Sequence, residues 1–258
     1  MAFDLSTRRG SPVLNSKTID AAADYDFSNK ETMTMSGFAN KLIALVSVTV
    51  IVALAIANLV DTKTAVGLTT ISGIVGLVLV LIMSFKPNTA QYIAIPYACV
   101  EGAFLSGLVL FAESLLPGVA FNALLATIGL LVATIICYRT GLIKVNEKFL
   151  SILKFAAVGV IAYVFFSLIA YFFMPSVSES LFSWTNGGFI GLGICVLLLV
   201  FGAMGLIADL YFTEEGIQKG LPKSFEWYCA MSVLITVVYV YVQMLELLVR
   251  IAYSFSQD

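Results

Sequence analysis

The sequence contains no histidine and few charged residues. Among its 258 residues, 14 are lysine or arginine and 16 are aspartate or glutamate, so 12% of the chain is charged and the net charge is −2. Histidine is the commonest general base, pH switch and metal ligand near neutral pH. Its absence argues against most kinds of catalytic centre, and we do not expect an enzyme. The weak negative charge argues against a nucleic-acid partner.

Cysteine is also scarce and gives no sign of a metal site or a disulfide framework. The four cysteines, Cys99, Cys137, Cys195 and Cys229, lie inside apolar runs and show no CxxC spacing. Such cysteines usually pack as small apolar residues. The sequence therefore predicts no resident cofactor, and the one ion that we expect near the protein is a calcium ion bound transiently by carboxylates.

Apolar residues, in contrast, make up 60% of the chain, and its mean hydropathy is +1.00. Because about a quarter of the residues in a typical soluble domain are charged, this composition indicates a polytopic membrane protein. Seven apolar runs each approach the roughly 20 residues that span a bilayer. They cover about residues 39–60, 65–84, 92–113, 119–138, 150–174, 189–211 and 227–253. A spanning segment must satisfy its own backbone hydrogen bonds, so the runs predict an all-α fold of seven transmembrane helices.

The chain divides into a polar tail, residues 1–36, and a helical bundle, residues 37–258. The tail has little apolar periodicity, and we expect it to be mostly disordered. Most cationic residues fall on the tail's side of the predicted membrane, which is the cytoplasmic side in multi-pass proteins. The sequence therefore predicts a protein of the inner (plasma) membrane with its N-terminus in the cytoplasm and its C-terminus outside. The cationic residues on the cytoplasmic side are Arg8, Arg9, Lys17, Lys30, Lys41, Lys86, Arg139, Lys144, Lys148, Lys154, Lys219 and Lys223, and only Lys63 and Arg250 fall on the other side.

Glu101 and Asp209 are carboxylates inside the third and sixth apolar runs, and a charge at membrane depth is costly enough to mark a functional site by default. Glu101 lies near the middle of the third run, where it is either a hydrogen-bonded packing residue or part of an ion path. Asp209 lies near the cytoplasmic end of the sixth run, and the loop expected after it carries Glu214 and Glu215. Neighbouring carboxylates can share protons or hold a hard cation. Asp209 and Glu214 are therefore the predicted calcium ligands, unless Asp209 is an interfacial charge solvated from the cytoplasm.

The seventh run carries three polar residues toward its outer end. Glu246 and Arg250 are four residues apart, the spacing of an ion pair on a helix, and we predict such a pair at the outer membrane interface. Gln243 is either a hydrogen-bonding residue between helices or part of the ion path. Glycines recur in other runs, among them Gly102 and Gly107, and predict close helix packing.

Seven segments along the chain carry a family resemblance. They are MTMSGFANK, FKPNTAQYIAIPYACVEGAFLSG, LPGVAFNALLATIG, CYRTGLIKVNEKF, ADLYFTEEG, LPKSFEWYCA and TVVYVYVQMLELL. Taken together and in order, from about residue 29 to residue 251, they resemble the transmembrane Bax-inhibitor-motif family, in particular its bacterial members with a longer N-terminal tail.

The resemblance implies six helices wrapped around a central seventh. Well-studied members behave as pH-sensitive calcium leaks, in which one acid on helix six and one on helix seven act as the sensor. Asp209 stands at the matching position of helix six, and Glu101, Glu214 and Glu226 match other acids of the family pattern. The leading prediction is thus a calcium or cation leak gated by protonation of carboxylates around Asp209.

The chain departs from the family pattern at three positions. Gln243 replaces the acid of helix seven, Tyr211 replaces a second acid after Asp209, and Glu246 replaces a residue that is more often basic. If Gln243 faced Asp209, the two could not share a proton as two acids do, and the pH response should be altered or lost. In the predicted topology Asp209 lies toward the cytoplasm and Gln243 toward the outside. The nearer candidate partners of Asp209 are therefore Glu226, Ser232 and Thr236.

A second function fits the same sequence. The chain would then be a membrane scaffold that regulates a membrane protease or quality-control complex through its tail, without conducting ions, as some bacterial relatives suggest. Its partners would be the lipid bilayer and another membrane protein. Deleting the tail would abolish this function, whereas replacing Asp209 by asparagine would not.

Overall fold

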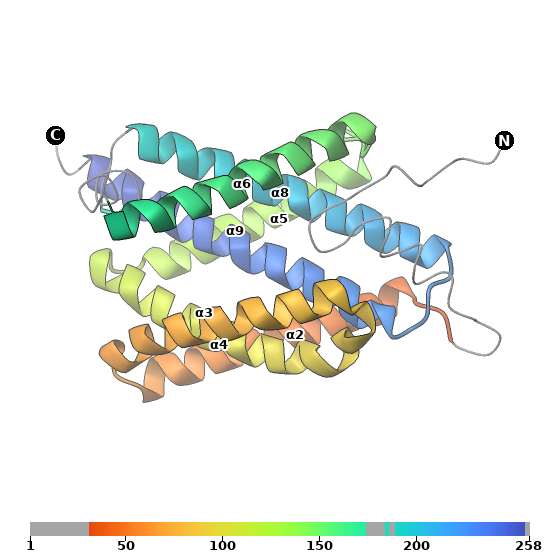
Figure 1. The fold of residues 1–258 in the computed structure, drawn as a ribbon, viewed down its shortest axis with the longest axis horizontal. Helices are drawn as coiled ribbons and strands as arrows, with labels where there is room; N and C mark the ends of the chain where they lie inside the picture. The colour runs from red at the N-terminus through yellow and green to blue at the C-terminus, as the bar shows by residue number, and fades with distance from the viewer. Residues whose placement is uncertain (1–30, 174–183, 186–188, 256–258) are drawn as a thin grey trace. The chain divides into compact units, whose positions relative to one another are not determined.

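The computed structural model describes residues 31–173, 184–185 and 189–255. Seven long helices occupy these residues (Figure 1): α2 (Met35–Leu59), α3 (Thr62–Phe85), α4 (Ala90–Leu115), α5 (Val119–Arg139), α6 (Glu147–Phe173), α8 (Phe189–Gln218) and α9 (Phe225–Phe255). A short 3₁₀ helix, η1 (Pro87–Thr89), precedes α4. All seven are long and apolar enough to cross a membrane, so the predicted all-α fold is confirmed. Of the predicted tail, residues 1–30 lie outside the described residues.

Helices α2 and α3 begin where the sequence supplies a capping side chain. Thr34 Oγ1 accepts a hydrogen bond from the backbone N–H of Gly37 at 3.0 Å. The Asp61 carboxylate accepts one from the backbone N–H of Thr64 at 3.1 Å. Such caps satisfy N–H groups that have no partner within the helix. They explain why both helices start within a few residues of their apolar runs.

The end of α8 differs most from the sequence prediction. The apolar run ends near residue 211, but α8 continues to Gln218, about two further turns. Glu214 and Glu215 therefore lie on the helix and not in the loop, so their predicted placement is wrong. The apolar run marks the length that is buried in lipid, whereas a helix can continue with polar residues beyond it. The chain turns at Gly220, whose φ of 65° favours glycine.

The chain divides into two compact units, which are described separately. The first comprises the described residues of Met1–Phe111 and Ala208–Ile235, and the second those of Ala112–Ile207 and Thr236–Asp258. Helices α8 and α9 each contribute one part to each unit. Among the described spans α9 is the most buried, with half of its span buried against at most 39% for any other. This burial agrees with the expected central position of the last helix.

In the first unit, α4 packs closely against α2 and α3. A Cβ atom on Gly102 would lie 2.6 Å from the backbone oxygen of Thr49 in α2. A Cβ atom on Gly107 would collide with the backbone oxygen of Ala65 in α3. Both positions accept only glycine, so the predicted close packing is confirmed at these two glycines.

In the second unit, α9 contacts α8 and α5. The Tyr239 hydroxyl donates to the backbone oxygen of Leu198 in α8 at 3.1 Å. The Tyr241 hydroxyl lies 3.4 Å from the backbone oxygen of Ala120 at the start of α5. The tyrosines thus fix α9 to two neighbouring helices by hydrogen bonds inside an apolar bundle.

Candidate functional site

Asp209 is buried in the first unit, near the end of the apolar run of α8. The residue is 1% exposed, and Ser232 on α9 donates from Oγ to its Oδ1 at 3.0 Å. Thr213, one turn further along α8, donates to the backbone oxygen of Asp209 at 2.7 Å. Of the nearer partners suggested by the sequence, Ser232 is therefore confirmed. At this burial Asp209 is not an interfacial charge solvated from the cytoplasm.

The hydrogen bond between Asp209 and Ser232 links α8 to α9 through a group that can lose its charge. A buried carboxylate is costly unless hydrogen-bond donors compensate its charge, and a donor to an ionised group forms a stronger bond than a neutral pair does. Protonation of Asp209 would therefore weaken the contact that the Ser232 hydroxyl makes. The arrangement can convert a proton into a change in helix contact.

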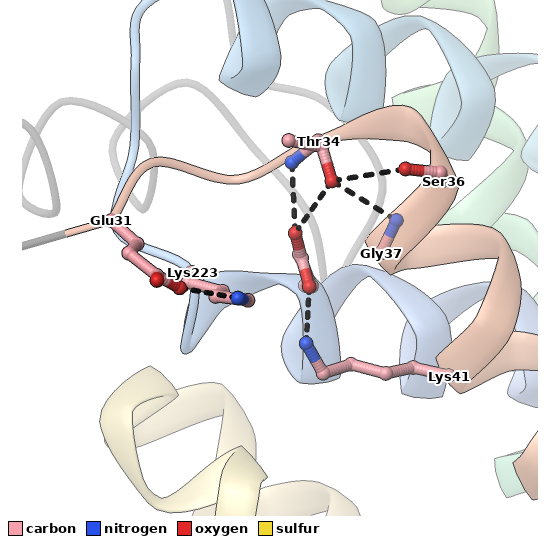
Figure 2. A network of polar contacts seen from close by, with 7 residues as sticks. Glu31, Thr34, Ser36, Gly37, Lys41 and Lys223 are labelled. Atoms are coloured by element: carbon pink, nitrogen blue, oxygen red, sulfur yellow. Dashed lines mark hydrogen bonds and ion pairs between the residues drawn. The ribbon is translucent and has the colours of Figure 1, made fainter.

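Glu226, in the first turn of α9, is a second buried carboxylate of the first unit. It is 0% exposed, and its Oε1 accepts from the backbone N–H of Thr34 at 2.8 Å and from the Thr34 hydroxyl at 3.3 Å. Its Oε2 forms an ion pair with Lys41 of α2 (Figure 2). A Cβ atom on Gly37 would collide with this carboxylate. Glu226 therefore fixes the start of α2 to the start of α9.

The residues before α2 pair with the connection between α8 and α9. Thr32 and Pro222 form an antiparallel bridge, and the backbone N–H of Met33 donates to the backbone oxygen of Leu221 at 2.7 Å. The end of the predicted tail, residues 31–34, is thus held against the bundle by main-chain hydrogen bonds.

An exposed ion pair between Glu31 and Lys223 accompanies this backbone pairing (Figure 2). The hydrogen bond from Lys223 lowers the pKa of the Glu31 carboxyl below its usual value. The same bond raises the pKa of Lys223. Both groups therefore stay charged throughout the neutral range.

Glu101 has its partner on its own helix. Tyr97, one turn earlier on α4, is hydrogen-bonded to the Glu101 side chain. A Cβ atom on Gly76 of α3 would lie 3.7 Å from Glu101 Oε2, so the carboxyl group faces α3. This geometry is that of a hydrogen-bonded packing acid, and a role in an ion path stays a prediction.

Glu214 lies on a different side of α8 from Asp209. Five residues along a helix correspond to a rotation of roughly 140°. Its neighbour Glu215 forms an ion pair with Lys219 at 3.3 Å. Within the part of the chain that the structure describes, no group of three or more His, Cys, Asp or Glu side chains could hold a metal ion. The calcium pair of Asp209 and Glu214 remains a prediction that helix geometry does not favour.

The second unit holds the other predicted residues of α9. Arg250 donates from Nη2 and Nε to Glu246 Oε1, at 2.8 and 3.0 Å, so the predicted ion pair is confirmed. Both residues are buried, and Arg250 is 1% exposed, so the pair lies inside the protein and not on its surface. Gln243 is buried one turn earlier on α9. Its two suggested roles, a hydrogen-bonding residue between helices or part of the ion path, stay predictions.

Sequence reasoning missed Thr34 and Lys41 as the partners of Glu226, and it missed Gly37, whose lack of a side chain leaves room for the Glu226 carboxylate. The segment MTMSGFANK contributed only to the family resemblance and to the count of cationic residues. One signal was available, because Lys41 is a cation inside the beginning of an apolar run and such a cation needs a partner. Nothing local to residue 41 indicates a carboxylate at residue 226.

These features define a polytopic α-helical membrane protein with buried carboxylates where its last two helices meet. Comparison with protein families identifies the class more closely. A family model described as Bax inhibitor 1 like matches residues 11–253. The chain therefore belongs to the Bax inhibitor 1 like family, and the resemblance drawn from the sequence is confirmed. Searches among curated proteins and among solved structures found no match.

Proposed function

We propose that this protein is a passive calcium or cation leak whose gate is set by the protonation state of Asp209. The observation that carries the proposal is the buried hydrogen bond between Asp209 and Ser232, which joins two membrane-spanning helices. An ionisable group in such a position is a functional-site candidate by default. The family resemblance supplies the ion, since well-studied members are calcium leaks.

The gate works through two states of one contact. While Asp209 is charged, the Ser232 hydroxyl donates to it and holds α9 against α8. When Asp209 takes up a proton, this bond loses its charge-assisted strength. The two protonation states therefore favour different contacts between the helices. The proton acts as a ligand that binds one conformation better than the other and so shifts the equilibrium between them. Calcium is the substrate of this path, coordinated in passing by oxygen atoms.

The proposal is tested by calcium flux into dye-loaded liposomes that contain the purified protein, scanned from pH 6 to pH 8. Asp209→Asn preserves the size of the side chain but removes its charge change, so we expect a flat profile. Asp61→Asn is the matched control, because Asp61 caps α3 outside the spans and asparagine is an equally good cap. An Asp209→Asn variant with the wild-type profile would refute the assignment of the gate.

One observation favours the scaffold function as a second candidate. Residues 31–34 are fixed to the connection between α8 and α9, so the point at which the preceding 30 residues join the described chain lies at this connection. On the topology inferred from the cationic residues, this attachment point faces the cytoplasm of an inner-membrane protein. A scaffold predicts that deleting residues 1–30 abolishes association with a membrane-protein partner, while Asp209→Asn leaves it intact. The reverse result favours the leak.

A further inference from the structure

We propose that residues 31–41 form a clasp that positions the start of α9 and thereby sets the pH at which the gate at Asp209 responds. Lys41 and Glu226 are the positioning residues of this clasp. The inference rests on the proposed function, because the quantity that the clasp controls is the pH response of the leak.

The clasp contacts the end of α8, the start of α9 and the connection between these two helices, which carry Asp209 and Ser232. Its main chain pairs with the connection between α8 and α9 through Met33 and Leu221. The buried Met33 side chain lies against α8, since a Cβ atom on Gly216 would be 3.2 Å from its sulfur. Lys41 pairs with Glu226 of α9 and lies 5.4 Å from the centre of the Trp227 ring. These contacts join α2, the end of α8 and the start of α9.

The gate lies within two helical turns of the clasp on both helices. Ser232 follows Glu226 by six residues on α9, which is about 9 Å along the helix axis. Asp209 precedes Gly216 by seven residues on α8, about 10 Å. A continuous helix transmits a displacement of its end over this distance. Release of the clasp would therefore shift Ser232 relative to Asp209.

The charged and titratable groups around the clasp limit where a pH response can arise. Glu226 on α9 pairs with Lys41 on α2. The negative charge of Glu226 also interacts electrostatically with Lys223 in the connection between α8 and α9. Lys223 is paired with Glu31. Cys229 on α9 lies within electrostatic range of both Asp209 and Glu226, and its thiol is hydrogen-bonded to Thr213. Glu31 and Lys223 stay charged between pH 6 and pH 8, so this ion pair is not the source of a pH response in that range. The Asp209→Asn variant then tests whether Asp209 is the group that titrates.

The first test compares the flux profiles of Lys41→Ala and Lys41→Arg in the full chain. Loss of Lys41 loosens the start of α9 and weakens the bond from Ser232, so we expect the flux midpoint to move to higher pH by about half a unit or more. Lys41→Arg keeps the cation and should retain the wild-type midpoint. Lys86→Ala, which removes an exposed lysine, is the matched control.

An engineered disulfide that locks the clasp should restore the flux midpoint of the Lys41→Ala variant. Thr32 and Pro222 face each other in an antiparallel bridge whose hydrogen bonds are made by their neighbours. Such pairs are about 4.5 Å apart at Cα, within reach of a disulfide. Thr32→Cys and Pro222→Cys, oxidised in the Lys41→Ala background, should return the midpoint to the wild-type value, and reduction should undo the rescue. A shift that persists with the clasp locked would overturn the inference.

Hydrogen exchange of residues 31–41 separates this inference from the proposed function. If Lys41→Ala speeds exchange there but leaves the flux midpoint unchanged, the clasp does not set the gate and the inference is wrong. If the wild type shows no flux at any pH, the leak itself fails, and exchange alone decides. Protection from exchange, measured relative to the intrinsic rate at each pH, that differs between pH 6 and pH 8 in the wild type but not in Asp209→Asn supports the coupling. Protection that is the same in both proteins at both pH values overturns it.

Discussion

At the scale of single residues, the proposed pH gate at Asp209 depends on the hydroxyl of Ser232. Hydrogen bonds to ionised groups contribute about 1.5–3 kcal/mol, and one pH unit corresponds to about 1.4 kcal/mol. Removing the donor with Ser232→Ala destabilises the charged form of Asp209, so protonation should occur at higher pH. We expect the midpoint of the flux profile to rise by about one unit.

Two further variants make the Ser232 prediction specific. Ser232→Thr retains the hydroxyl and should keep the wild-type midpoint. Ser106→Ala removes another buried hydroxyl of the first unit, one that donates to the backbone of its own helix, and should also leave the midpoint unchanged. A midpoint in Ser232→Ala that matches the wild type would show that this hydrogen bond does not hold the gate.

Gly37 offers a test of the space around Glu226. A methyl group at this position would collide with the buried Glu226 carboxylate and displace it from Lys41 and Thr34. We expect Gly37→Ala to lower the free energy of unfolding by about 2 kcal/mol or more, because it breaks the partners of a buried charge. Thermal unfolding in detergent measures the loss. Gly67→Ala is the control, since no atom lies within 4 Å of its Cβ position, and equal melting temperatures for the two variants would contradict the prediction.

The exposed ion pair of Glu31 and Lys223 should not respond to pH in the neutral range. The lowered pKa of Glu31 means that its contribution is present above pH 4.5 and is lost as the pH falls through the folded-state pKa. The raised pKa of Lys223 means that its contribution is present below pH 10.5 and is lost only above that. Lys223→Gln should therefore speed hydrogen exchange at residues 31–34, relative to the wild type at the same pH, by the same factor at pH 6 and pH 8. An effect at only one of these values would show that the pair titrates in this range.

At the scale of helices, the sequence predicts the spans well because length and hydropathy determine what crosses a bilayer. Residue spacing predicts a polar contact directly where both partners lie on one helix, whereas between helices the sequence suggested only three candidate partners for Asp209, among them Ser232. The spacing of Glu246 and Arg250 indicates their ion pair, but not its burial, which depends on the face that packs inward. Lys41 and Glu226 are 185 residues apart, and no local pattern joins them. Only the packing of α2 against α9 brings the two together.

Close packing of α4 gives a test at this scale. Gly107 lies where a Cβ atom would meet the backbone of Ala65 in α3, and a backbone oxygen cannot move aside as a flexible side chain can. We expect Gly107→Ala to separate α4 from α3 and to cost about 1–3 kcal/mol, as overpacking does. Gly129→Ala in α5, with no atom within 4 Å of the Cβ position, should be neutral. Thermal unfolding of the two variants in the same detergent decides, and similar stabilities would contradict the packing.

At the scale of the whole molecule, the chain belongs to the Bax inhibitor 1 like family, and its sequence departs from the two-acid sensor that the resemblance implies. Gln243 replaces the acid of helix seven, while Asp209 has Ser232 as a hydrogen-bond partner. A single titrating carboxylate with a hydroxyl donor is enough to make a proton-dependent contact between two helices. The sequence comparison suggested that the sensor would be altered, and the structure supplies a hydrogen bond that is compatible with a one-acid sensor.

The most direct test of this account is calcium flux through the purified protein in dye-loaded liposomes between pH 6 and pH 8, with protein-free liposomes as the baseline. The account predicts a flux that depends on pH in the wild type and that Asp209→Asn makes independent of pH. Flux no greater than the baseline at every pH would contradict it and would favour the scaffold function.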